Sequence, residues 1–62
     1  MELIDYAHPM MMAEKHQRLA HDALLSRDFA TGKEELLKAI AELRLAAMSV
    51  THMAEQAKKE AR

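Results

Sequence analysis

The chain has 62 residues, with nine Lys or Arg, ten Asp or Glu and a formal net charge of −1. That length fits one small domain, and the charge lacks the basic excess that is typical of nucleic-acid binders. Cysteine is absent, which excludes disulfides and thiolate metal sites and suits a cytoplasmic protein. No apolar run approaches the roughly 20 residues of a membrane span, and the acidic start of the chain is unlike a signal peptide.

The composition favours helices. Half of the residues are hydrophobic, mostly Ala, Leu and Met, and there is one Gly and one Pro. Residues 1–8 are expected to form an N-terminal arm and residues 9–62 a single domain. Because the residue before a proline avoids helical geometry, His8 stays in the arm, and Pro9 suits the first position of a helix over about 9–26.

The first helix is amphipathic, with its apolar side chains on one face. A loop over 27–31 follows, and Thr31 with Glu34 matches a capping box that starts a second helix over about 32–61. A cap at Asp28 is the alternative, and it starts that helix three residues earlier. The expected core of this antiparallel hairpin is Met12, His16, Leu19, Ala23, Leu24, Leu37 and Met48.

A second apolar row follows the longer helix at alternating spacings of four and three residues, the pattern of close helix packing. The helices are about 27 and 45 Å long, so the first covers the second only to around residue 50, unless Leu3, Ile4 and Tyr6 fold over its end. We therefore predict a homodimer or higher assembly, with two hairpins forming a four-helix bundle. The expected interface is Leu36, Ile40, Leu43, Ala47, Val50, Ala54 and Ala57.

The stretch "HPMMMAEKH" contains soft-metal ligand types, and His8, Met12 and His16 share one helical face. Methionine is also a common packing residue, and we favour packing over a metal. No nucleophile or carboxylate motif for catalysis is present. We expect no metal, no cofactor and no enzymatic activity.

A basic patch near the turn, made of Lys15, Arg18, Arg27 and Lys33, would allow a dimeric DNA-binding regulator. Acidic residues lie among these bases and weaken any phosphate-driven affinity. DNA binding is therefore the weaker alternative.

The favoured function is a non-enzymatic protein–protein interaction or regulatory protein. Apolar side chains left exposed often mark binding sites, and an obligate heteromeric adaptor subunit is a further alternative. The candidate partner surface is Met10, Met11, Leu25, Phe29 and Leu45.

Through "LLSRDFATGKEELLKAIAELRLAAMSVTHMAEQA", the chain resembles the small, cysteine-free helical accessory proteins of temperate, lambdoid bacteriophages. The resemblance implies a protein of the host cytoplasm that influences the infected cell or the choice between lysis and lysogeny by contacting other proteins. It implies no catalytic residues.

Overall fold

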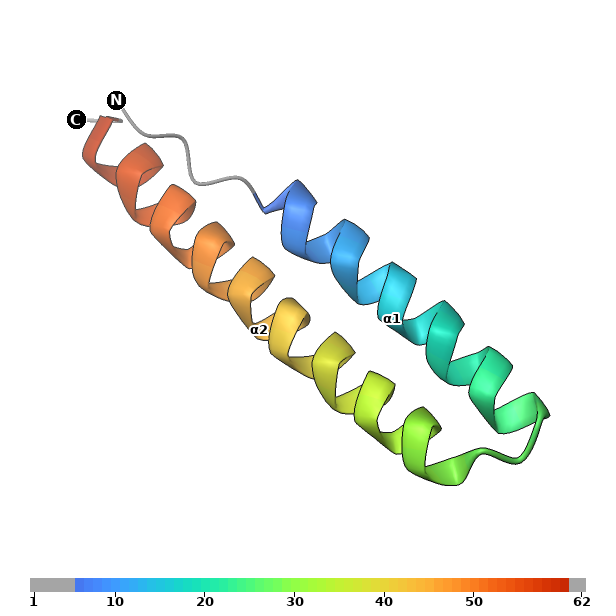
Figure 1. Ribbon diagram of the computed structural model, residues 1–62. Coiled ribbons are helices and arrows are strands. Elements are labelled where there is room, and N and C mark those ends of the chain that lie inside the picture. Colours follow the sequence, from blue (N-terminus) through green and yellow to red (C-terminus); the bar gives the residue numbers. More distant parts are fainter. Residues whose placement is uncertain (1–5, 61–62) are drawn as a thin grey trace.

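The computed structural model describes residues 6–60, and this part of the chain forms two helices and no strand. Helix α1 spans Ala7–Leu25 and helix α2 spans Phe29–Glu60. The helices run antiparallel, side by side, and α2 continues beyond the start of α1 (Figure 1). The Cα atoms occupy a rod of 54 × 13 × 13 Å. The predicted all-α hairpin is confirmed, and its pairing into a four-helix bundle stays a prediction.

The first helix begins two residues before the expected Pro9. The N–H of Met10 donates to the carbonyl oxygen of Tyr6 at 3.2 Å, and His8 is helical. The first N–H groups of a helix have no partner within it, so a proline in the first turn costs no hydrogen bond. The expected N-terminal arm therefore ends before Ala7 rather than at His8. Two of its apolar residues, Leu3 and Ile4, lie outside the described residues.

The turn between the helices is short because α1 ends in a Schellman motif. The N–H of Arg27 donates to the Leu24 carbonyl at 3.0 Å, and the N–H of Asp28 donates to the Ala23 carbonyl at 2.8 Å. Arg27 has a φ of 61°, the left-handed conformation that this motif requires. These two bonds satisfy carbonyls at the helix end and reverse the chain direction.

The second helix is capped by Asp28, so the capping box at Thr31 and Glu34 is wrong and the alternative cap is confirmed. The Asp28 Oδ1 accepts a hydrogen bond from the N–H of Thr31 at 3.2 Å. Hydrogen bonds from the Thr31 side chain and backbone lower the pKa of Asp28. Because Asp28 is both the last residue of the Schellman motif and the helix cap, no room remains for the expected loop over 27–31.

The seam between the helices consists of small residues. No large side chain is fully buried among the described residues, and the hydroxyl of Ser49, at the far end of the seam, donates to the Leu45 carbonyl at 3.0 Å. Spacings of three, four and seven residues place these positions on one face of each helix. The buried residues are Pro9, Ala13, Ala20 and Ala23 on α1, and Gly32, Ala39, Ala46 and Ser49 on α2.

The structure corrects the expected hairpin core. Ala23 is buried, and Met12 and His16 are half-buried. In contrast, Leu19, Leu24, Leu37 and Met48 are exposed, the last two by more than half. Small residues repeat every seven positions on α2, and they let the two backbones approach more closely than leucines would. The larger side chains are consequently displaced to the flanks.

Gly32 is the clearest sign of this close approach. A Cβ atom at Gly32 would lie 2.7 Å from Cδ2 and 2.9 Å from Cγ of Leu24. Leu24 therefore leans over the backbone of α2, at the end of the hairpin next to the turn. Glycine is needed here for space, since its φ is not positive.

Candidate interaction surface

The predicted interface row forms one flank of α2. Its large members, Leu36, Ile40, Leu43 and Val50, are 43–50% exposed, and Ala47, Ala54 and Ala57 are exposed as well. Helical spacing places this row about a quarter of a turn around α2 from the buried seam. The row thus remains available for another helix, and its role as a dimer interface stays a prediction.

The same flank continues onto α1 at the turn. Leu24 leans over Gly32, and Gly32 precedes Leu36 by four residues, about one helical turn. An apolar surface formed by both helices is a platform for another helical pair, whereas a row on a single helix offers a narrower contact. The sequence row was visible from its spacing, but its continuation onto α1 depends on the packing at Gly32.

A polar contact interrupts the alanine seam. The Nδ1 of His16 lies 2.6 Å from the Glu35 Oε1, with side chains 16% and 13% exposed. Lys38 Nζ lies 3.3 Å from the other Glu35 oxygen and 3.6 Å from Glu34 Oε1. The hydrogen bond from His16 is the main cause that lowers the pKa of Glu35, and Lys38 adds to it. This contact joins residues 19 positions apart, one on each helix.

The contact also bears on the metal row that the sequence offered. His16 is held against Glu35, while His8 is exposed. Within residues 6–60, no group of three His, Asp or Glu side chains is placed to hold a metal ion.

The candidate partner residues are all exposed, but the structure does not gather them. Met10 and Met11 lie near the start of α1, and Leu25 and Phe29 flank the turn. Met11 and Leu25 are separated by 14 residues, or about 21 Å along the helix. Leu45 lies on α2, and it is 52% exposed. These residues make separate small patches.

Leu45 instead lines an open groove that the sequence did not suggest. The groove has a volume of about 600 Å³. Its lining consists of Leu45, Ala47, Met48, Ser49, Thr51, His52 and Glu55. Met48 and His52 are four residues apart, and that spacing alone could have indicated a shared face.

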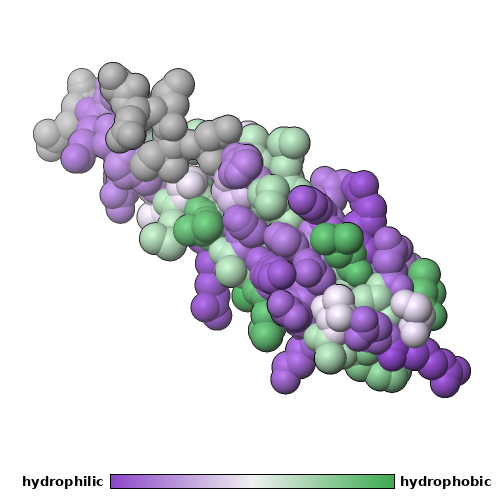
Figure 2. Space-filling model, viewed as in Figure 1, coloured by the Kyte–Doolittle hydropathy of each residue, from purple (hydrophilic) through white to green (hydrophobic). Residues whose placement is uncertain are grey.

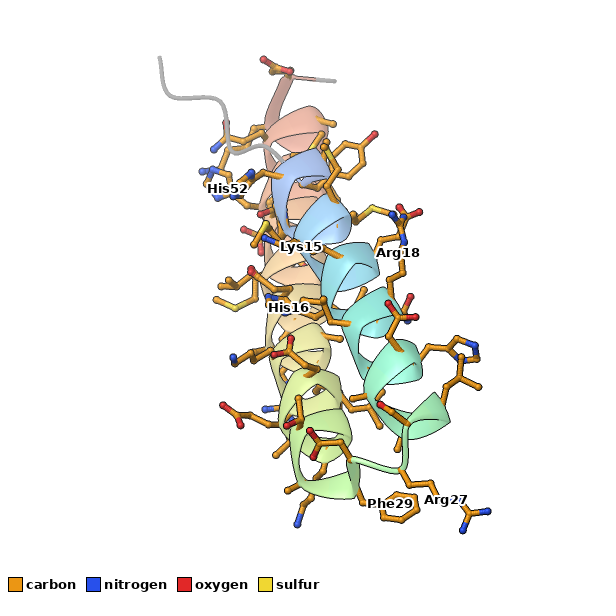
Figure 3. All side chains as sticks on the ribbon, turned by 45° about the vertical axis from the view of Figure 1, so that its right-hand side comes forward. Lys15, His16, Arg18, Arg27, Phe29 and His52 are labelled. Atoms are coloured by element: carbon orange, nitrogen blue, oxygen red, sulfur yellow. The ribbon has the colours of Figure 1, made fainter. Side chains whose placement is uncertain are left out.

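The basic residues of the DNA-binding alternative lie on both helices and at the turn between them. Lys15 and Arg18 are three residues apart on α1, and Arg27 lies at the turn (Figure 3). Arg18 Nη2 lies 3.4 Å from Glu14 Oε1, with both side chains exposed. The face in Figure 2 mixes hydrophilic side chains with separate hydrophobic clusters, and DNA binding stays the weaker alternative.

Neither described helix is long and apolar enough to cross a membrane. Comparisons with protein-family models, curated proteins and solved structures give no match. The class that the fold defines is an all-α antiparallel hairpin with a small-residue seam. Any statement of function therefore has to come from the surface.

Proposed function

We propose that the protein is a small, non-enzymatic interaction protein that acts as a homodimer, with the apolar flank of α2 at the centre of a four-helix bundle. The strongest support is the difference in size between the buried and the exposed apolar residues. Apart from Pro9, the buried hydrophobic side chains within residues 6–60 are alanines, whereas Leu36, Ile40, Leu43 and Val50 remain about half exposed. A chain of this length is marginal as a monomer, and these side chains contribute little to stability until another surface covers them.

The size of the rod favours a contact that uses both helices. A standard interface buries about 800 Å² on each partner. The accessible surface is 5287 Å², so such a contact takes about 15% of it. A stable dimer therefore needs a broad contact along the 54 Å length of the rod, and two two-helix hairpins packed along their length make a four-helix bundle.

Burial of the row provides a suitable driving force. Full burial of a large aliphatic side chain contributes about 1.5–3 kcal/mol, so burying the exposed half contributes about 1 kcal/mol. The four large residues of two copies together contribute about 8 kcal/mol before the entropy of association is subtracted. The resemblance to phage accessory proteins further supports a regulatory role in which the dimer contacts another protein in the host cytoplasm.

The first test is molar mass in solution, measured by light scattering over a range of concentrations. We expect twice the chain mass of 7.0 kDa. Leu43→Glu should reduce the mass to that of one chain, because it places an unpaired charge in the apolar interface. Leu45→Glu is the matched control: Leu43 and Leu45 are 45% and 52% exposed, but they lie about 200° apart around α2.

The two variants also separate the proposed dimer from a heteromeric adaptor. A native chain that remains a helical monomer at every concentration would contradict the homodimer and favour an adaptor that pairs with a different protein. If both variants equally lose the mass of the dimer, the cause is loss of folding, and circular dichroism would show that loss.

A further inference from the structure

Side-chain size decreases along the α2 flank from its N-terminal half to its C-terminal half. The large residues Leu36, Ile40 and Leu43 occupy its first half, and Val50, Ala54 and Ala57 occupy its second half. The spacing of the row is nearly symmetric about Ala47. When the row is reversed onto itself, Leu43 meets Val50, Ile40 meets Ala54, and Leu36 meets Ala57.

From this order we infer that the second copy lies antiparallel, α2 against α2, with a two-fold axis near Ala47; this inference rests on the homodimer proposed above. Helix axes pack 8–10 Å apart, at a distance set by the side chains in contact. In the antiparallel pair, large residues face small ones, so that distance stays constant along the bundle. A parallel pair would place leucine against leucine at one end and alanine against alanine at the other, which would splay the axes or leave a void.

The orientation of the helix dipoles is independent of side-chain size, and it favours the same arrangement. The helix dipoles align unfavourably when two adjacent helices are parallel. The antiparallel pair therefore satisfies both the packing and the helix dipoles.

The absence of cysteine makes the orientation directly testable by disulfide cross-linking. A disulfide needs Cα atoms roughly 4.4–6.8 Å apart, so only facing positions cross-link readily. We expect Ala47→Cys to form a covalent dimer with itself under mild oxidation. Ile40→Cys and Ala54→Cys should each cross-link poorly alone, and their mixture should give mainly the mixed dimer, identified by mass spectrometry. Ala41→Cys, on the opposite side of α2, is the control that should remain uncross-linked.

Each result decides the orientation or the dimer itself. Efficient self-cross-linking of Ile40→Cys and of Ala54→Cys, without excess mixed dimer, would overturn the antiparallel arrangement and leave the dimer intact. A dimeric mass with no cross-link at any of the three row positions would also overturn it, because the row would then not form the interface. A monomeric mass before oxidation, with helical circular dichroism retained, would instead refute the homodimer on which the inference rests.

Discussion

Replacement of Gly32 by alanine tests whether close approach of the helices holds the hairpin together. In an exposed helix, this change stabilises a protein by about 1 kcal/mol through helix propensity. Here the added Cβ would lie 2.7 Å from Leu24 Cδ2 and 2.9 Å from its Cγ. Overpacking of this kind costs about 1–3 kcal/mol. The gain in helix propensity and the larger cost of overpacking together predict that Gly32→Ala lowers the free energy of unfolding by about 1 kcal/mol, although helices in general favour alanine over glycine.

The same change should have the opposite sign when Leu24 is shortened. In a Leu24→Ala background both close atoms are gone, and the next neighbour of the Cβ is the Ala20 carbonyl oxygen at 3.7 Å, an ordinary contact. Gly32→Ala should then stabilise by up to about 1 kcal/mol, which gives a coupling of about 2 kcal/mol in the double-mutant cycle. Urea unfolding followed by circular dichroism, at one fixed protein concentration, measures both values. An equal effect of Gly32→Ala in the two backgrounds would refute the close-approach argument.

Three further changes address the turn, the seam and its polar contact. Arg27→Gly should raise the free energy of unfolding by about 0.5–1 kcal/mol. Glycine removes the cost of the left-handed conformation, and the larger loss of backbone entropy on folding offsets part of that gain. An unchanged or lower urea midpoint would argue against strain at the turn. Ala39→Leu should lower the free energy of unfolding by about 1–3 kcal/mol, because the larger side chain separates the helices. Ala41→Leu, on an exposed face, should change this free energy little. Equal effects of the two changes in thermal unfolding would refute the alanine seam. Since Glu35 has a lowered pKa in the folded chain, its stabilising contribution is present above the ordinary glutamate pKa and is lost as the pH falls through the lowered value. Acidification from the ordinary to the lowered pKa should therefore lower the midpoint temperature of thermal unfolding. The decrease should be larger for the native chain than for Glu35→Gln.

The sequence predicts the helices well because helix formation is local. Low Gly and Pro content and long amphipathic segments were enough to indicate two helices in a hairpin. The boundaries were less accurate where two local signals competed. Asp28 and Thr31 both resemble helix caps, and the choice of Asp28 depends on the Schellman motif that precedes it.

The exposure of the predicted interface row was predictable for a related reason. The row from Leu36 to Ala57 follows from spacing alone, and its large members are exposed on the described chain. The polar contact between His16 and Glu35 was not predictable, because the two residues are 19 positions apart and meet only when the register of the helices is fixed. The groove beside Leu45 and Met48 likewise went unnoticed, because Met48 was assigned to the core.

The sequence by itself thus determined that the chain forms two amphipathic helices with more apolar surface than one hairpin buries. Only the tertiary structure decided which apolar residues form the seam. Hydrophobicity ranks Leu37 and Met48 above Ala39 and Ala46, but the distance between two helix backbones depends on side-chain volume. Alanine and glycine allow the closest approach, so they occupy the seam, and the larger side chains remain on the outside.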